Sequence, residues 1–149
     1  MSYHFIDEDR LKLRFPVYEK KKFKRFCYSD FLLGKQILEA KYDVLKPEQC
    51  TGLRDKDGNL IYEGDILFVK TFDWKNKERW NAGEVKTYWS VEYKDYWNHC
   101  GFMVFGINRR FHKPLTRTTV FNSEAIVVGN IHENKELLND FLDKNGNNN

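Results

Sequence analysis

Apolar and polar residues alternate along several stretches of this chain, and the alternation predicts strands. Residues 84–93 place Val, Thr, Trp, Val and Tyr on one side and Lys, Tyr, Ser and Glu on the other, as in a strand with one buried face. Residues 10–18 repeat the pattern, with charged residues between apolar ones. Pro16 has no backbone N–H to donate, so we expect it at an edge or an end of that strand.

Two turn signals organise the middle of the chain. Asp57-Gly58 predicts a hairpin turn, because glycine accepts a positive φ and aspartate tolerates one. A second turn is expected at Glu63-Gly64-Asp65, before a continuous apolar run. The strands expected around these turns are 51–54, 60–62 and 66–69, and the last is expected to be covered on both faces.

Shorter patterns complete the predicted elements. They indicate strands at 26–33, 101–107, 118–121 and 125–128, an exposed turn at 19–25 and a basic loop at 109–117. Near the end of the chain, Asn134 is a candidate helix N-cap, and the apolar residues after it form one helical stripe. The helix is expected within 131–144, and the asparagine-rich residues 145–149 are expected to form a disordered tail.

The order of these elements predicts one α+β, mainly β, domain over residues 1–144. We divide it into a β extension at 1–47, a β-barrel-like core at 48–130 and the helix at 131–144. The length of 149 residues suits a single domain. Aromatic residues make up 16% of the chain, and their large rings supply the buried area that a core needs.

The charge of the chain is uneven. Its net charge is +3, and residues 1–46 carry 11 Lys+Arg against 7 Asp+Glu, which favours an acidic partner there. The chain opens with polar and acidic residues, and no apolar run approaches the roughly 20 residues that span a bilayer. Its three cysteines are widely spaced, unlike a disulfide framework. We therefore expect a cytoplasmic protein that makes no membrane contact.

No set of residues indicates a reaction, so we expect neither an enzyme nor a bound cofactor. Glu63 and Asp65 have the chemistry for acid–base catalysis, but carboxylates beside a glycine more often cap a turn before a strand. The cysteines and two of the histidines lack the closely spaced pairs of a zinc site, so buried, inert cysteines are the simpler interpretation. These residues are Cys27, Cys50, Cys100, His99 and His112.

Two basic clusters carry the candidate contact residues. Both contain phenylalanine among the cations, namely Phe23 and Phe26 in the first and Phe111 in the second. Cations contact phosphates and rings stack on bases, so this composition suits single-stranded nucleic acid. Solvated turns beside core aromatic residues are the favoured alternative, because the net charge is small. The candidate contacts, to nucleic acid or to a protein partner, are Lys21, Lys22, Lys24, Arg25, Arg109, Arg110 and Lys113.

The number of tryptophans exceeds what a small core usually needs. A subunit interface would account for some of them, because tryptophan and tyrosine are enriched in interfaces. Ordinary packing accounts for them equally well, so a homo-oligomer and a monomer are both open at this point. The four are Trp74, Trp80, Trp89 and Trp97.

Two blocks of the chain resemble the YopX family of phage and prophage proteins: CTGLRDKDGNLIYEGDIL at 50–67 and IVVGNIHENKELL at 126–138. The family pattern has a Thr-Gly-Leu-Lys-Asp-like turn, an Ile-Tyr-Glu-Gly-Asp-Ile block and a closing Val-Gly-Asn-Ile segment. The chain departs from the pattern at His132, where the family usually has an aromatic residue, and at Lys135, where it often has proline. The matching positions are Thr51, Gly52, Leu53, Asp55, Gly58, Ile61, Tyr62, Glu63, Gly64, Asp65, Ile66, Gly129, Asn130, Ile131, Glu133, Asn134, Glu136 and Leu137.

The resemblance implies a phage or prophage origin, the cytoplasm of a bacterial host cell and a partly open SH3-like barrel. It implies no catalytic or binding residues, so the candidate contacts stay those of the two basic clusters. With no catalytic set in the chain, it favours a non-catalytic accessory protein that binds a protein partner. Nucleic-acid binding through residues 20–25 and 109–117 is the alternative.

Overall fold

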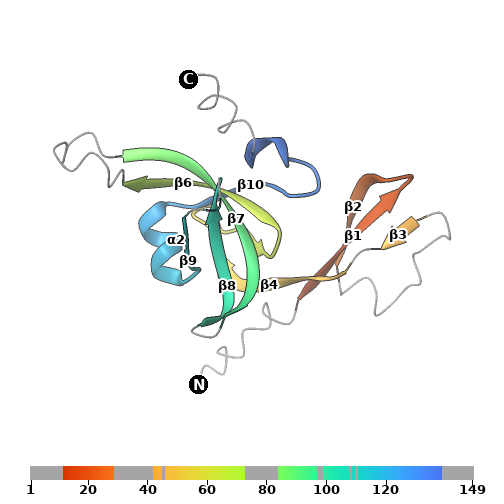
Figure 1. Ribbon diagram of the computed structural model, residues 1–149. Coiled ribbons are helices and arrows are strands. Elements are labelled where there is room, and N and C mark those ends of the chain that lie inside the picture. Colours follow the sequence, from red (N-terminus) through yellow and green to blue (C-terminus); the bar gives the residue numbers. More distant parts are fainter. Residues whose placement is uncertain are drawn as a thin grey trace.

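The computed structural model describes residues 12–28, 42–44, 46–72, 84–96, 99–107, 109 and 111–138. Within them the protein is mainly β. It has two antiparallel sheets, one of which curls into a half-barrel, and short helices (Figure 1). The mainly β class predicted from the sequence is therefore confirmed.

The first sheet contains β1 (Leu13–Glu19), β2 (Lys22–Tyr28), β3 (Tyr42–Val44), β4 (Glu48–Arg54) and β5 (Leu60–Tyr62). Its order is β2-β1-β4-β5, with β3 paired to β1. β1 and β2 form a hairpin, called the arm below, that projects from the half-barrel (Figure 1). The predicted turn at 19–25 is only Lys20 and Lys21, because β2 already begins at the next residue. Both have a positive φ, 49° and 66°, as the commonest two-residue hairpin turn requires.

Pro16 lies inside β1 and not at its end, but β1 has a strand on one side only at this residue, so the predicted edge holds locally. Its side chain is fully buried, and it faces Phe26 of β2. On the other side of β1, β4 pairs with residues up to Arg14 and β3 pairs from Val17 onward. Pro16 therefore occupies the gap between these two strands, where no described strand needs its missing N–H.

β2 contains a β-bulge at Lys24. The register between β1 and β2 slips by one residue there, so Lys24 has no partner on β1. The extra residue shifts the alternation of side chains, and it brings Phe23 and Phe26 to the same face of the arm. Both rings contact His132, at centroid distances of 5.5 and 5.8 Å. The bulge thus gives the arm an aromatic face that packs against the end of the chain.

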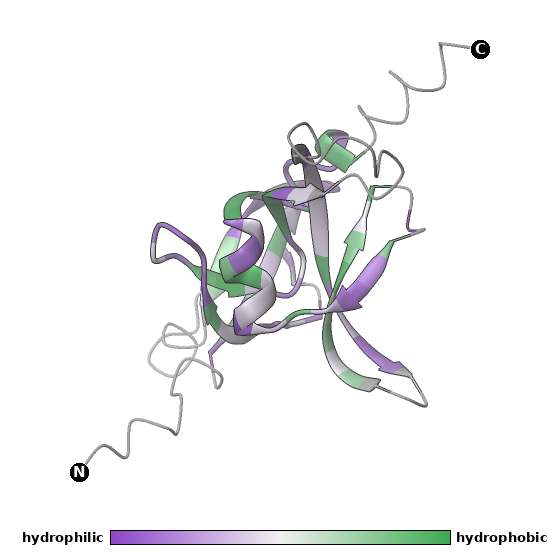
Figure 2. Cartoon of the chain, turned by 90° about the vertical axis from the view of Figure 1, so that its left-hand side faces the viewer, coloured by the Kyte–Doolittle hydropathy of each residue, from purple (hydrophilic) through white to green (hydrophobic). Residues whose placement is uncertain are grey.

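The half-barrel sheet contains β6 (Asp65–Phe72), β7 (Glu84–Tyr96), β8 (His99–Gly106), β9 (His112–Pro114) and β10 (Ile126–Asn130), in the order β10-β6-β7-β8-β9. It holds the main core, in which Leu67, Trp89 and Val104 are almost fully buried. The helix α2 (Arg117–Ser123) packs against β6 and adds Val120 to this core. Figure 2 shows apolar segments of the half-barrel beside α2.

The predicted hairpin and second turn are both confirmed. β4 and β5 pair around Asp57-Gly58, and a turn at Glu63-Gly64 leads into β6. The side chain of Asp55 accepts the N–H groups of Asp57 and Asn59, at 2.9 and 2.8 Å. It also accepts the N–H of Val127 on β10, at 2.9 Å. One carboxylate therefore shapes the hairpin and ties it to the half-barrel.

The strand predicted at 118–121 was wrong, because these residues lie in α2. The Thr116 hydroxyl accepts the N–H of Thr119 at 3.1 Å and caps the helix. Glu124 ends it in a left-handed conformation, with φ 50°. The β-branched residues of this stretch favour strands, but local capping and the burial of Val120 decide for a helix. The predicted loop at 109–117 likewise contains β9 and the first residue of α2.

Several other predictions meet the structure only in part. β7 and β8 confirm the strands predicted at 84–93 and 101–107, and β10 replaces the one at 125–128. A helical turn covers 136–138, within the predicted helix. The described residues do not include the rest of the predicted helix and tail, 139–149, or the end of the strand predicted at 26–33. They also do not include Trp74, Trp80 and Trp97. The Asn134 side chain accepts the N–H of Asn130 behind it, at 3.3 Å. No helix of the described residues has the length and apolarity to cross a membrane.

Candidate functional site

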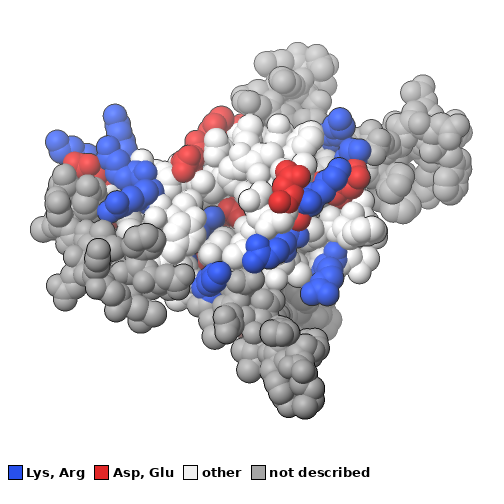
Figure 3. Space-filling model, turned by 180° about the vertical axis from the view of Figure 1, so that it is seen from behind, with Lys and Arg blue, Asp and Glu red and all other residues white. Residues whose placement is uncertain are grey.

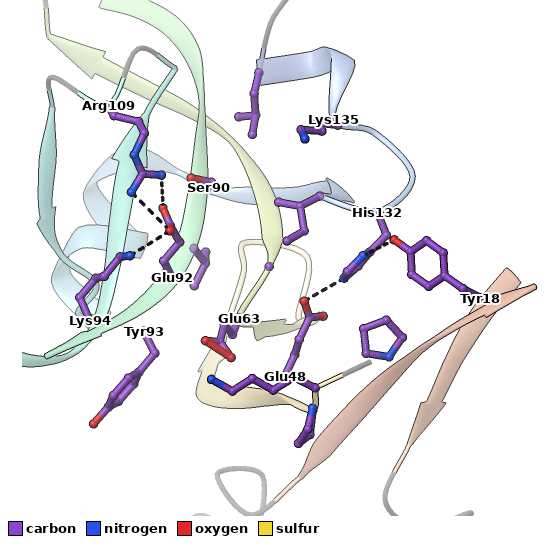
Figure 4. Close-up of a pocket in the computed structure, with 17 residues that line it drawn as sticks. Tyr18, Glu48, Glu63, Ser90, Glu92, Tyr93, Lys94, Arg109, His132 and Lys135 are labelled. Carbon is purple, nitrogen blue, oxygen red and sulfur yellow. Dashed lines mark hydrogen bonds and ion pairs between the residues drawn. The ribbon is translucent and has the colours of Figure 1, made fainter. Parts of the chain in front are cut away.

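A groove of about 680 Å³ lies between the two sheets (Figure 4). One wall is built from the arm, the start of β4 and the segment after β10, through residues such as Tyr18, Glu48 and His132. The other wall is residues 90–94 of β7 together with Arg109. The groove therefore joins parts of the chain that are far apart in the sequence.

His132 is held at both of its ring nitrogens. Nδ1 lies 2.6 Å from the Tyr18 hydroxyl, and Nε2 lies 2.9 Å from Oε2 of Glu48. An ionised carboxylate only accepts hydrogen bonds, so Nε2 donates to Glu48. In a neutral ring Nδ1 then accepts a hydrogen bond from the Tyr18 hydroxyl. The ring also stacks on Phe23, with a centroid distance of 5.5 Å. This arrangement fastens the arm to the segment that follows β10.

Arg14 continues the network beneath the groove, and its side chain is only 5% exposed. Its guanidinium reaches Oε1 of Glu48 at 2.9 Å, Oδ1 of Asp65 at 2.7 Å and the backbone oxygen of Glu63 at 3.0 Å. The group also lies over the ring of Phe26, with Cζ 4.0 Å from the centroid. Arginine suits this place, because its planar fork can donate to several acceptors while stacking on a ring.

The pKa values of this network indicate a structural role. Burial raises the pKa of Asp65 to about 6 although Arg14 opposes the shift, so Asp65 is ionised at neutral pH. Its other oxygen accepts the N–H of Tyr62 at 2.8 Å, as the turn-capping interpretation predicts. Burial, together with the charge of Glu48, raises the pKa of Tyr18 above its ordinary value. Tyr18 therefore stays protonated and serves as a hydrogen-bonding group rather than a nucleophile.

The β7 wall carries its own charged cluster. Glu92 pairs with Arg109 at 2.6 Å and with Lys94 at 3.4 Å (Figure 4). Tyr93 lies between Glu92 and Lys94 in the sequence, and its side chain remains 45% exposed. Its hydroxyl lies 3.0 Å from Sγ of Cys100, and this hydrogen bond raises the pKa of Tyr93. The wall thus presents an exposed ring beside ion pairs that are already formed.

The predicted contact residues do not form one surface. Lys21, Lys22, Lys24 and Arg25 lie in the arm, and Figure 3 shows cations gathered at its end. Arg109 lines the groove, while Lys113 lies on β9 over the ring of Trp89, with Nζ 4.8 Å from the centroid. Burial lowers the pKa of Lys113. Arg110 lies outside the described residues.

The aromatic residues of the basic clusters are engaged within the fold. Phe23 and Phe26 pack on His132. Phe111 is 38% exposed, but it stacks on Trp89 with a centroid distance of 5.5 Å. Rings in such contacts have at most one face left for a nucleic-acid base, which weakens the stacking hypothesis.

The cysteines follow their predicted role only in part. Cys27 and Cys50 are buried, as expected, whereas Cys100 is exposed. Across the described residues, no group of three or more His, Cys, Asp and Glu side chains is arranged to hold a metal ion.

Sequence reasoning missed Arg14, Glu48 and His132 as partners. The only signal for them is the departure from the family pattern at His132, which replaces an aromatic residue with one that also bonds to Tyr18 and Glu48.

Comparison with known proteins gives structural matches and one family. The chain is similar to the crystal structure of protein EF1440 from Enterococcus faecalis, with 25% sequence identity and a TM-score of 0.40. The match covers 83% of this chain and 74% of that one. No curated protein matches the chain. The model of the YopX protein family matches residues 4–139, and the chain therefore belongs to the YopX family.

Proposed function

We propose that this protein is a non-catalytic accessory protein of a phage or prophage that binds a protein partner in the host cytoplasm through the groove. The observation that carries the proposal is the exposure of Tyr93 and Ile131, 45% and 38%, in a groove between the sheets. Exposed apolar side chains in a hollow surface mark interaction sites more often than single exposed residues elsewhere. In this proposal the half-barrel is an SH3-like module.

The state of the polar groups around the groove also supports binding rather than catalysis. Both ring nitrogens of His132 are engaged, and the pKa of Tyr18 is raised. A general base needs a nitrogen or oxygen that faces the substrate, and a tyrosine nucleophile needs a lowered pKa. Neither condition holds in this wall of the groove.

Affinity capture from host cells that carry the phage or prophage tests the proposal. The wild-type chain is compared with a groove variant, Tyr93→Ala/Ile131→Ala. A surface variant, Tyr28→Ala/Val128→Ala, is the matched control, because these two side chains are also exposed, at 40% and 41%, but do not line the groove.

We expect a captured protein that is retained by the wild type and the surface variant and lost from the groove variant. Circular dichroism of all three chains checks that the fold is kept. Equal capture by the wild type and the groove variant would show that the groove is not the binding site. Turnover of a substrate by the wild type that disappears in Glu63→Gln, with folding intact, would contradict the non-catalytic role.

Nucleic-acid binding by the arm is the second candidate, on a separate observation. Within the described residues, Lys20, Lys21 and Lys22 form no ion pair, and the nearby Lys24–Glu19 pair is long, at 3.7 Å. A protruding group of unpaired cations suits a phosphate backbone. Titration with single- and double-stranded DNA and RNA at 50 and 200 mM salt should then show affinity that falls steeply with salt. Lys21→Gln/Lys22→Gln should reduce that dependence, and no binding at low salt would remove this candidate.

A further inference from the structure

β7 is longer than its neighbours, and one part of it has a strand on one side only. β6 pairs with it from Glu84 to Ser90, and β8 pairs with it from Trp89 to Tyr96. Beyond Ser90, the side of β7 that β6 would extend along carries no paired strand among the described residues. This stretch, residues 92–96, is called the β7 edge below.

The backbone groups of the β7 edge can be assigned a direction. The Val91 carbonyl accepts the N–H of Gly64 at 2.8 Å, which lies on the β6 side. Alternate residues of a strand direct their N–H and C=O groups to the same side, so those of Tyr93 and Asp95 also point to the β6 side. On β8, the Phe102 carbonyl accepts the N–H of Leu115 at 2.9 Å, away from β7. Because Phe102 faces Tyr93, this second bond gives the same direction independently.

The groove runs along this edge. Five consecutive residues of β7, 90–94, line it. Successive side chains of a strand point to opposite faces of the sheet, so a hollow that meets all five must lie against the edge rather than against one face. The N–H and C=O groups of Tyr93, which pair with no strand among the described residues, therefore open into the groove.

The charges of the groove favour an acidic occupant. Four cations line it, namely Lys46, Lys94, Arg109 and Lys135, against the carboxylates of Glu48, Glu63 and Glu92. Glu48 is already held by Arg14 from beneath the groove, and two of the cations share Glu92. Lys46 and Lys135 form no ion pair with any described residue. Acidic side chains in the groove would have these two cations to pair with.

We propose that the groove binds an extended, acidic segment of a partner protein, which adds as a strand to the β7 edge. The inference rests on the proposed protein-binding role and names the kind of partner. Backbone hydrogen bonds to Tyr93 and Asp95 hold the segment, and alternate side chains reach the cations and the Tyr93 ring. Five residues of edge are about 17 Å long, which matches a strand of ordinary length.

Hydrogen exchange of the uncomplexed chain tests the edge itself. By NMR, the amides of Tyr93 and Asp95 should exchange at least about 100-fold faster than those of Glu92 and Lys94, which bond to β8. Equal protection of all four amides would show that the edge is already occupied and would overturn the proposal.

A displayed library of random 12-residue peptides then serves as the binding probe. Selected peptides should be enriched in Asp, Glu and β-branched residues, and the best of them should protect the Tyr93 and Asp95 amides. Two forms of that peptide are then made, one methylated at the odd backbone nitrogens and one at the even ones. An added strand bonds through every second residue, so one form should bind at least about tenfold more weakly than the other. Equal binding by both methylated forms would rule out strand addition.

A pair of variants separates the backbone from the side chain. Tyr93→Pro removes the edge-facing N–H, and Tyr93→Ala keeps it while removing the ring. Proline is tolerated where the N–H bonds to no strand, so the first variant should fold, and it should bind the selected peptide more weakly than the second. Suppose that a partner is captured through the groove and yet binds Tyr93→Pro and Tyr93→Ala with equal affinity. That result would keep the protein-binding role and rule out strand addition. If neither a partner nor any peptide depends on the groove, both fail.

Discussion

Arg14 is the residue on which the two sheets depend most. It connects β1 to β4 through Glu48 and to the start of β6 through Asp65. A guanidinium buried among two carboxylates is costly to bring out of water, and its stabilisation comes from several hydrogen bonds made at once. Removing the cation leaves two buried carboxylates without their main partner.

We therefore predict that Arg14→Met lowers the free energy of unfolding by about 3–5 kcal/mol. Urea denaturation of the two chains measures the difference. Lys24→Met is the control from the same hairpin, since its ion pair with Glu19 is exposed and 3.7 Å long, and it should cost at most about 1 kcal/mol. A similar loss from both substitutions would contradict the central role of Arg14.

Asp65 gives the network a dependence on pH. Burial raises the pKa of Asp65 from 3.8 to about 6. The folded chain therefore binds a proton at Asp65 more readily than the unfolded chain does. The protonated carboxyl contributes fully to the free energy of unfolding below about pH 4. This contribution, about 3 kcal/mol, is lost as the pH rises through about 6.

The matching prediction compares the wild type with Asp65→Asn, which cannot titrate. The free energy of unfolding of the wild type relative to the variant should increase as the pH falls from 7.5 to 4.5. Urea denaturation across this range gives the difference at each pH. A difference that shrinks with acidification would mean that the ion pair with Arg14 outweighs the burial of Asp65.

At the scale of single residues, the sequence predicted which carboxylates cap turns, but it did not predict which side chains pair across the fold. Asp55 and Asp65 lie beside glycine-containing turns, and turn capping by carboxylates is a local property that neighbouring residues reveal. Arg14 looked like an exposed cation in an alternating strand. Its partners lie 34 and 51 positions further along the chain, and no local pattern encodes contacts over such distances.

Among the elements, the turn of the arm shows a local conflict between residue type and conformation. Lys20 and Lys21 both adopt the left-handed region, with φ 49° and 66°. That region costs an ordinary residue roughly 1 kcal/mol and suits asparagine and glycine.

We predict that Lys20→Asn/Lys21→Gly raises the free energy of unfolding by about 1 kcal/mol. Lys20→Gln/Lys21→Gln removes the same charges without supplying turn residues, and it should leave stability nearly unchanged. Thermal denaturation of both variants distinguishes the turn from the charge. If both variants gain equally, repulsion between the lysines explains the gain instead.

The elements themselves were largely predictable, with one informative exception. Strands and turns of residues 51–69 follow from local alternation and glycine positions, and the structure confirms them. The stretch at 118–121 has strand-forming residues, yet it forms α2. The Thr116 cap and the burial of Val120 against β6 outweigh intrinsic propensity here, as tertiary contacts often do for short elements.

At the scale of the whole molecule, the groove could not be predicted from the sequence. It exists because the arm is fastened across the chain, through contacts such as Tyr18 with His132, which are 114 positions apart. The two predicted basic clusters lie in different parts of the fold, one in the arm and the other around β9.

A homo-oligomer stays a prediction, and the structure changes which residues to examine. Trp89 is only 2% exposed and belongs to the core, whereas Phe121 on α2 is 80% exposed. We expect light scattering to give a multiple of the 17.9 kDa chain mass, and Phe121→Ser to shift it toward a single chain. Asn122→Ser, at the neighbouring exposed position, should have no effect. A monomer mass for the wild type at high concentration would end this prediction.

The bulge at Lys24 has a consequence for comparing family members. It is the insertion of one residue that sets Phe23 and Phe26 three positions apart while their rings share a face. A relative whose arm lacks the bulge needs its two aromatic residues only two positions apart to keep the same face. Alignments of the family should therefore show single-residue gaps at this position, and deleting Lys24 in the laboratory should remove the bulge while both rings still face His132.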